Sequence, residues 1–239
     1  SPTTLPSHAS LFTGQYPPTH GARNSRTHRL SEEAVTLAEA LQGQGYETGA
    51  VVSTMVLNSR FGLEQGFDHY DQNLAVGSYN KIYLDRETPA ADTISRAKEW
   101  VEKRGDKPFF LWVHLSDPSQ PYSPPPGYAE RCNGNPYDGE IAYADEQLGI
   151  LLGALRQKEL LRHTLVVATG DHGESLGEHG ERAHSIFLYD SSTRVPLIFS
   201  HAKLQQSAVL SHVVSHIDVA PTILELLGLQ PLQSSIGVS

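Results

Sequence analysis

The stretch that decides the fold is HTLVVATGDHGESLGEHGE, residues 163–181. Its first seven residues form a short apolar run typical of a buried parallel strand, and Asp171 and His172 follow almost directly. Open α/β sheets place their ligands at the carboxyl ends of the strands. The stretch therefore predicts half of a metal site, although a surface loop would also accept this many Gly, Glu and His residues.

Three further apolar runs, rich in Val, Ile and Phe, predict strands over residues 48–53, 109–114 and 195–200. Helical patterns separate the runs, over residues 34–41 (preceded by Ser31), 92–104, 138–158 and 219–227. Asp218 precedes the last helix, and its carboxylate is predicted to cap that helix rather than to bind a ligand. This alternation predicts an α/β fold, with a mostly parallel central sheet flanked by helices on both faces.

Length and composition narrow the class of protein. The 239 residues, 38% of them hydrophobic, suffice for one large core, and we expect one domain rather than two. The net charge of -9 argues against nonspecific binding to nucleic acid. Cys132 is the only cysteine, which excludes an internal disulfide or a thiolate cluster. No apolar run is long enough for a membrane segment, and the compartment stays open.

Thr4 is the candidate nucleophile. It lies in TLPSHASLFTG, residues 4–14, where Pro6 and Ser7 suit the first turn of a helix. A hydroxyl at that position faces free backbone N–H groups and the positive end of the helix dipole, which would stabilise an alkoxide and a bound anion. Simple capping of the helix is the alternative role for Thr4.

Four segments, in their order and spacing, resemble the successive motifs of the sulfatase family within the alkaline phosphatase superfamily. They are TLPSHASLFTGQYPPTHG (4–21), GDHGESLGEHGE (170–181), LYDSSTRVPLIF (188–199) and SHIDVAPTILELLGL (215–229). Weaker matches fill the intervals, so the resemblance covers nearly the whole chain. It implies a sulfatase-like catalytic domain over residues 1–239. We expect this to be a fragment that lacks a first strand upstream of Ser1 and a C-terminal subdomain.

The resemblance also implies a set of site residues. Thr4 matches the nucleophile, and Asp171, His172 and Thr4 itself match positions that would hold a divalent cation. The cation would be calcium, magnesium, manganese or zinc. The family's other acidic ligands come from a strand just before the nucleophile motif, which is the strand that we expect upstream of Ser1.

The sequence departs from the family at several of these positions. Formylglycine formation needs Cys or Ser at position 4 and Arg at position 8, but Thr4 and His8 stand there, so we do not expect formylglycine. A sulfated threonine lacks the elimination route of a geminal diol, whereas an unmodified threonine suits phosphoryl transfer. Residues 51–58 lack the family's Lys and His, and Ser119 stands where a His is usual.

The remaining imidazoles and acids have open roles. His8 or His184 could act on the leaving oxygen, and His184 could also bind a second metal ion or be a plain surface residue. His114 follows a predicted strand, where a structural role is the simpler interpretation. The sequence does not separate supporting from solvent-exposed roles for the other loop residues, Glu174, Glu178 and His179.

Together these features predict a metal-dependent hydrolase that cleaves a sulfate or a phosphate or phosphonate ester by attack of Thr4. Its partner would be a small anionic ester. One alternative is a transferase of the phosphoethanolamine or glycerol-phosphate type. Another is a sulfatase-like domain that binds without catalysis, which the missing Lys and His would explain.

Overall fold

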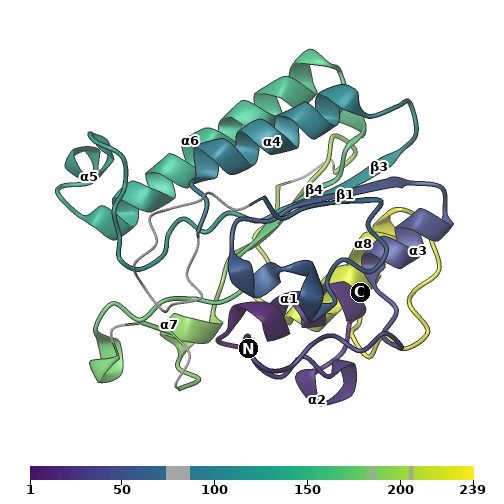
Figure 1. Cartoon of the computed structure of the whole chain (residues 1–239), viewed down its shortest axis with the longest axis horizontal. Coiled ribbons are helices and arrows are strands. Elements are labelled where there is room, and N and C mark those ends of the chain that lie inside the picture. Colours follow the sequence, from purple (N-terminus) through teal and green to yellow (C-terminus); the bar gives the residue numbers. More distant parts are fainter. Residues whose placement is uncertain (74–86, 182, 185–186, 205–206) are drawn as a thin grey trace. The chain divides into compact units, whose positions relative to one another are not determined.

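The computed structural model describes residues 1–73, 87–181, 183–184, 187–204 and 207–239 (Figure 1). The chain divides into two compact units. The first unit comprises residues 1–44, 59–66 and 163–239, and the second comprises residues 45–58 and 67–162. Each unit is described by itself below, and the expectation of one domain over residues 1–239 stays a prediction.

The second unit contains a three-stranded parallel sheet. Its strands are β1 (Glu47–Val51), β2 (His69–Asp71) and β3 (Phe109–Val113), in the order β2-β1-β3. Both neighbours of β1 run parallel to it, with Gly49 opposite His69 on one side and Leu111 on the other. This sheet confirms the predicted α/β class and the mostly parallel pairing.

Two long helices pack with this sheet. They are α4 (Ala90–Lys103) and α6 (Pro136–Gln157), which lie side by side (Figure 1). The Asn135 side chain accepts hydrogen bonds at the start of α6, and Pro136 follows it, so the helix begins two residues earlier than its apolar pattern predicts. The helices and strands share one apolar core, made of Val51, Ile94, Ala97, Trp100, Val101, Leu151 and Leu155.

The connection from β3 to α6 is held by a buried carboxylate. It contains the short helix α5 (Tyr128–Arg131). Glu140 of α6 accepts hydrogen bonds from the backbone N–H groups of Ser119 (2.9 Å) and Ser123 (2.6 Å). Burial raises the pKa of Glu140 above its usual value, and these two hydrogen bonds oppose that shift. The Pro-rich segment is therefore tied to the helix at two points.

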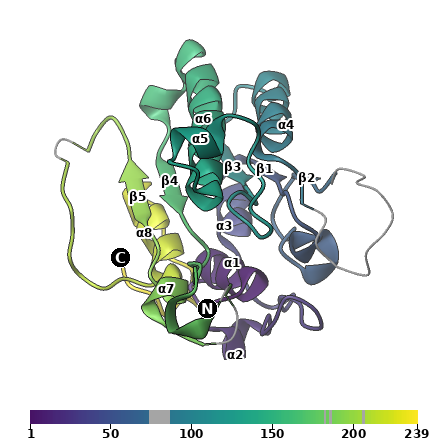
Figure 2. The same cartoon turned by 90° about the vertical axis from the view of Figure 1, so that its left-hand side faces the viewer.

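The first unit contains a two-stranded antiparallel sheet of β4 (Val166–Thr169) and β5 (Leu197–Ser200), which lie side by side (Figure 2). Val166 pairs with Ser200, and Thr169 pairs with Leu197. The apolar runs predict both strands. Their antiparallel pairing is the exception to the mostly parallel arrangement.

The helices of the first unit are α1 (Thr4–Thr13), α2 (Pro17–His20), α3 (Leu37–Gly43), α7 (Asp190–Thr193) and α8 (Val219–Leu226). The predicted start of α3 after Ser31 is wrong. The helix begins at Leu37, because Thr36 and Glu39 form a capping box in which each side chain accepts the other's backbone N–H.

Asp218 is a capping residue, but of a different turn from the one predicted. Its Oδ2 accepts the backbone N–H of Ser215 at 2.8 Å, which closes a capping box around the 3-10 helix η5 (His216–Asp218). Its Oδ1 accepts the backbone N–H of Val238 at 2.9 Å. The carboxylate therefore ties the entrance of α8 to the C-terminal segment.

Among the described residues, four other segments form 3-10 helices: η1 (Met55–Leu57), η2 (Ser59–Phe61), η3 (Leu161–His163) and η4 (Glu178–Gly180). In the described part of the chain, no helix combines the length and apolarity needed to cross a bilayer.

Candidate active site

Helix α1 presents Thr4 at its first turn. Thr4 is the first helical residue, the preceding Thr3 is extended, and the backbone N–H of Leu5 donates to Ser25 Oγ at 3.3 Å. Leu5 and Phe12 are buried and anchor the helix, while Thr4 remains partly exposed. The Thr4 hydroxyl therefore lies at a helix amino terminus, as the sequence predicts.

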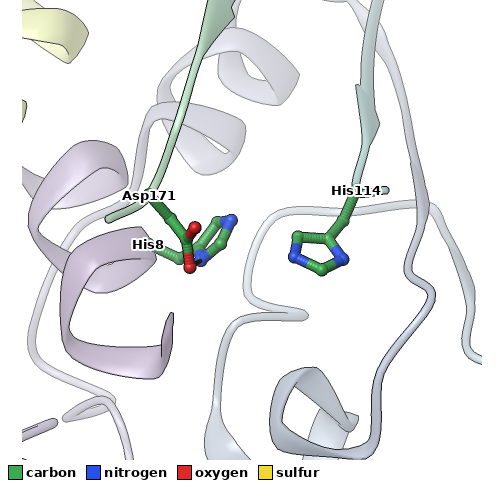
Figure 3. A group of neighbouring side chains, drawn as sticks. All are labelled: His8, His114 and Asp171. Carbon is green, nitrogen blue, oxygen red and sulfur yellow. Dashed lines mark ion pairs between the residues drawn. The ribbon is translucent and has the colours of Figure 1, made fainter. Parts of the chain in front are cut away.

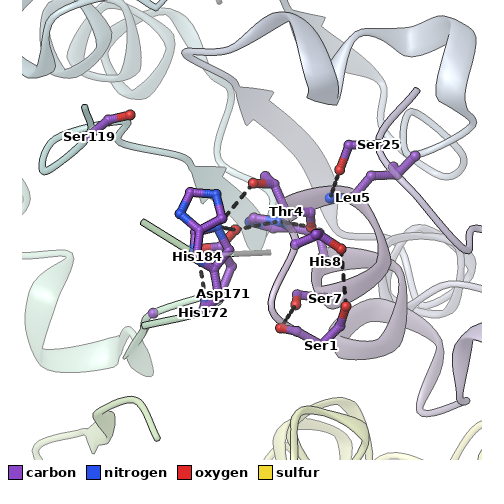
Figure 4. A network of polar contacts seen from close by, with 12 residues as sticks. Ser1, Thr4, Leu5, Ser7, His8, Ser25, Ser119, Asp171, His172 and His184 are labelled. Carbon is purple, nitrogen blue, oxygen red and sulfur yellow. Dashed lines mark hydrogen bonds and ion pairs between the residues drawn. The ribbon is translucent and has the colours of Figure 1, made fainter. Parts of the chain in front are cut away.

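Asp171 and His172 follow strand β4 and lie close to Thr4. His172 Nδ1 donates to the carbonyl of Gly173 at 3.0 Å, which leaves Nε2 as the acceptor of the ring. Nε2 lies 3.2 Å from Thr4 Oγ1, so the Thr4 hydroxyl donates to it (Figure 4). The structure thus brings together the candidate nucleophile and the candidate ligand.

Asp171 lies next to two imidazoles. Its Oδ2 is 3.4 Å from His172 Nε2. The same oxygen is 3.7 Å from His8 Nδ1, and Figure 3 shows the two side chains of Asp171 and His8 next to each other. His8 is buried on α1, and its Nδ1–H donates to the Thr4 carbonyl at 2.9 Å. Burial lowers the pKa of His8 more than the nearby carboxylate raises it. At neutral pH His8 is therefore neutral, and its contact with Asp171 is not an ion pair.

His184 lies against the ring of His172. The two ring centroids lie 3.9 Å apart, and the ring planes are tilted by 33°. His184 Nδ1 lies 3.3 Å from Oε1 and 3.4 Å from Oε2 of Glu174. The predicted candidates Thr4, His172 and His184 therefore form a continuous chain of contacts, with His172 in the middle.

Two other residues of this loop, Glu178 and His179, make contacts outside the candidate site. The exposed Glu178 accepts the backbone N–H of Leu176 at 2.7 Å, and the ring of His179 stacks on Tyr189. The sequence leaves the roles of Glu174, Glu178 and His179 undecided. Among the interactions of the described residues given above, only those of Glu174 involve a candidate site residue.

His114, also drawn in Figure 3, belongs to the second unit. It directly follows β3, and its backbone N–H donates to the carbonyl of Val51. Its Nδ1 lies 2.8 Å from Ser53 Oγ, which in turn lies 2.8 Å from Ser116 Oγ. These contacts within its own unit support the structural role at the strand end.

His216 is a neighbour of the site that sequence reasoning missed. Its Nε2–H donates to the carbonyl of Gly170, the residue before Asp171, at 2.9 Å. Burial lowers its pKa, so this imidazole is neutral at neutral pH. His216 lies in the segment SHIDVAPT, where the sequence predicts a helix. Nothing in the spacing of this segment predicts that the imidazole of His216 contacts residue 170.

Gly173 lets the loop after β4 approach α7 closely. Its N–H donates to the carbonyl of Ser192 at 2.9 Å. A Cβ atom at residue 173 would lie 2.0 Å from the carbonyl oxygen of Ser191. Ser175 Oγ and Ser191 Oγ add a hydrogen bond at 2.8 Å. The segment that carries Asp171 and His172 is therefore braced against α7 by hydrogen bonds.

The donor set fits a divalent cation. The Asp171 carboxylate and His172 Nε2 offer the oxygen and nitrogen ligands that such ions use, and the Thr4 hydroxyl lies beside them. A metal-binding histidine commonly donates its other ring N–H to a carbonyl, as His172 does to Gly173. His8 Nδ1 is already engaged with a carbonyl, so it is a poorer ligand atom.

Comparison with known proteins agrees with this fold. The family model described as Sulfatase matches residues 1–229. The chain therefore belongs to the sulfatase family, within the alkaline phosphatase superfamily, as its four motifs predict.

Among its relatives is the ulvan-active sulfatase of Formosa agariphila, 27% identical over 284 aligned positions that cover 100% of this chain and 54% of that protein. Arylsulfatase K of Bos taurus is 31% identical over 164 residues, which cover 62% of this chain and 30% of that protein. The chain thus spans about half, or less, of these curated relatives.

Solved structures share the fold. One protein, solved in complex with its substrate D-glucosamine-2-N,6-O-disulfate, has a TM-score of 0.80 at 20% identity and is covered to 70% by the whole of this chain. A protein of the alkaline phosphatase superfamily from Vibrio parahaemolyticus has a TM-score of 0.74 at 22% identity, over 97% of this chain and 56% of that one. At these identities the likeness establishes the fold alone.

Proposed function

We propose that this chain carries the catalytic centre of a hydrolase that cleaves an anionic ester, with Thr4 as the nucleophile. The observation that supports this most is the 3.2 Å contact between Thr4 Oγ1 and His172 Nε2. The contact places the hydroxyl at a helix amino terminus, beside the imidazole that would hold the cation, and the helix dipole favours a bound anion.

Asp171 and His172 would hold a divalent cation beside Thr4. When bound, such an ion lowers the pKa of a neighbouring hydroxyl and neutralises charge on the transferring group. The residues themselves orient the site: His172 keeps its Nδ1 hydrogen on the Gly173 carbonyl, and Gly170 is fixed by His216.

His184 is better placed than His8 to act on the leaving oxygen. His8 is buried, and its Nδ1 hydrogen is used by the Thr4 carbonyl. The side chain of His184 is 30% exposed, so a substrate can reach it, and its ring contacts that of His172. We therefore assign leaving-group protonation to His184 and a supporting role within α1 to His8.

The element at the centre of the ester is sulfur or phosphorus. The relatives named above are sulfatases, which favours a sulfate ester. Thr4 favours phosphorus, because an unmodified threonine has no elimination route out of a sulfated intermediate but can form and hydrolyse a phospho-threonine. Since one structural neighbour binds a sulfated glucosamine, we expect the alcohol part of the substrate to be a sugar.

A substrate panel tests this function. The full-length protein is assayed with and without added Mg²⁺, Ca²⁺, Mn²⁺ or Zn²⁺ on aryl sulfate, phosphate monoester, phosphodiester and phosphonate. Metal-stimulated turnover of any of these supports the hydrolase, and turnover of aryl sulfate alone would identify sulfur as the central element of the ester. Metal binding without turnover of any ester would favour a binding domain instead.

A further inference from the structure

We infer that Phe187 is a specificity-determining residue, whose exposed ring stacks on the sugar ring of the substrate. This inference rests on the proposed function, in which the alcohol part of the ester is a sugar. Phe187 has no role in that proposal so far. Together with Tyr189 and His179 it forms a group of contacting rings, which we call the aromatic cluster.

Phe187 presents an aromatic ring to solvent. The residue is 55% exposed. Its ring centroid lies 5.7 Å from that of Tyr189, at an interplanar angle of 54°. The Tyr189 ring in turn stacks on the ring of His179, with the centroids 3.9 Å apart and an interplanar angle of 18°. One face of Tyr189 is therefore covered, which makes Phe187 the better placed of the two benzene rings to receive a ligand.

Two buried side chains hold the backbone of Phe187. Its N–H donates to Glu181 Oε1 at 3.2 Å, and its carbonyl accepts from Ser192 Oγ at 2.9 Å. Ser192 Oγ also lies 3.0 Å from the Tyr189 carbonyl, so its single hydrogen is shared between both aromatic residues. Scattered exposed apolar residues need no explanation. An aromatic residue whose backbone is held on both sides, however, is already ordered for binding and loses little conformational entropy there.

Ser192 also joins the aromatic cluster to the candidate site. Its backbone carbonyl accepts the N–H of Gly173 at 2.9 Å, and Gly173 directly follows His172. Both Figure 1 and Figure 2 show α7, which contains Ser192, close to the amino-terminal end of the chain, and both segments belong to the first unit. A substrate whose anionic group lies at Thr4 can therefore extend its alcohol part toward Phe187.

The chemistry around the aromatic cluster favours a sugar as the ligand. The exposed Glu178 precedes His179 in the chain. The exposed Asp190 follows Tyr189. The C–H face of a sugar ring packs on an aromatic face, and sugar hydroxyls donate to carboxylates. The same acids disfavour an anionic membrane surface, which attracts basic side chains instead. A sugar ring is therefore the ligand that fits this part of the chain.

A purely structural role of Phe187 makes a different prediction. If the ring only packs against another part of the protein, its replacement should affect all substrates alike. If the ring stacks on a sugar, the effect should appear in KM and only for esters whose alcohol part is a sugar, because stacking contributes to binding and not to the chemical step.

The experiment compares kcat and KM of the full-length wild type, Phe187→Leu and Phe187→Tyr on a glucose ester and an ethyl ester of the oxyacid that the panel identifies. Phe187→Leu keeps an apolar side chain but removes the aromatic face. We expect its KM for the glucose ester to rise roughly 5- to 10-fold, with kcat and both constants on the ethyl ester within about twofold. Phe187→Tyr keeps the ring and should retain the KM of the wild type.

Val209→Ala is the matched control, because it changes another exposed apolar side chain of the first unit, between β5 and η5. It should act like the wild type on both esters. An equal rise in KM on both esters in Phe187→Leu, or an unchanged KM for the glucose ester, would overturn the inference.

A binding measurement without turnover separates this inference from the proposed function. The full-length protein, with ¹³C-labelled phenylalanine, is titrated with methyl β-D-glucopyranoside up to about 100 mM, since one sugar ring binds weakly. The ring signals of Phe187, identified by their loss in Phe187→Leu, should shift with this sugar and not with glycerol, which has hydroxyls but no ring. Unshifted signals refute the stacking even if the enzyme is active. Shifted signals in a protein that cleaves no ester refute the proposed function alone.

Discussion

Thr4 and His172 are 168 positions apart in the sequence, yet Thr4 Oγ1 and His172 Nε2 lie 3.2 Å apart. The first turn of α1 and the end of β4 meet at this contact, both within the first unit. The hydroxyl of Thr4 is the donor, since the other ring nitrogen of His172 is engaged with the Gly173 carbonyl. The candidate site therefore depends on two segments that only the folded chain brings together.

Replacing Thr4 should abolish turnover without unfolding the protein. Thr4→Val keeps the shape and removes the hydroxyl, so we expect kcat/KM of the full-length protein to fall at least about 1,000-fold, while Thr4→Ser retains measurable activity. Thr3→Val is the control, since the Thr3 hydroxyl contacts Ser1 Oγ instead of a candidate site residue. Activity of Thr4→Val near that of the wild type would exclude Thr4 as the nucleophile.

Asp171 should be needed for metal binding. Asp171→Asn keeps the size of the side chain and removes its charge, so we expect the affinity for a divalent cation to fall at least about tenfold. Isothermal titration of the full-length protein with Mn²⁺ or Zn²⁺ measures this, with Asp190→Asn, an exposed acid of α7, as the control. Unchanged affinity and stoichiometry in Asp171→Asn would remove Asp171 from the ligands.

Glu140 should stabilise the loop that follows β3. Glu140→Ala leaves two N–H groups, of Ser119 and Ser123, without their acceptor, and we expect the free energy of unfolding to fall by about 3 kcal/mol. Urea denaturation measures the loss, and hydrogen exchange should show faster exchange of these two amides. Glu146→Gln, at an exposed position of α6, should change the stability by less than about 0.5 kcal/mol.

Two glycines of the second unit should respond to alanine in opposite directions. A Cβ at Gly49 of β1 would lie 2.5 Å from the Trp100 ring, so Gly49→Ala should destabilise by about 1 to 3 kcal/mol. Gly153, inside α6, has open space around it, so Gly153→Ala should stabilise by about 0.5 to 1 kcal/mol. Thermal unfolding checks both, and a Gly49→Ala variant as stable as the wild type would contradict the packing described.

His20 should make the fold less stable in acid. Its Nδ1 accepts the N–H of Ala22, its Nε2–H donates to Ser10 Oγ, and burial lowers its pKa from 6.5 to about 4. As the pH falls from 6.5 to 4, the unfolded chain gains a proton on this imidazole before the folded chain does. The stability should therefore drop by about 3 kcal/mol over that window.

The test for His20 is urea unfolding at pH 7 and pH 4. His20→Gln should lower the stability at pH 7 and reduce the difference between the two pH values by about the same 3 kcal/mol. An unchanged pH difference in the variant would show that His20 does not cause the acid sensitivity.

Periodic segments can be predicted from the sequence, and pairings cannot. The apolar runs over 109–114 and 195–200 both contain strands, but only the first lies in a parallel sheet, because pairing depends on distant partners. The start of α3 is predictable in principle, since T-x-x-E at Thr36–Glu39 is a capping-box signal. Ser31 is the weaker of the two candidate start signals, because no such glutamate follows it at the required spacing.

Most of the candidate site residues can be predicted from the order of the motifs in the sequence. The motifs identify Thr4, Asp171 and His172, and the structure places their side chains in contact. Glu174 cannot be separated from Glu178 by sequence, because a loop has no periodicity that assigns side chains to faces. Only the fold decides which of the two acids meets His184.

The close approach of Gly173 to α7 has a practical consequence for anyone who wishes to redesign the specificity of this protein. Residue 173 accepts no side chain without moving Ser191, so a combinatorial library should leave this codon fixed. Gly177, further along the loop, has open space around it but a positive φ of 113°, which disfavours other residues. Diversity is therefore best introduced at exposed neighbours such as Leu176 and Glu178, where neither crowding nor backbone geometry limits the choice.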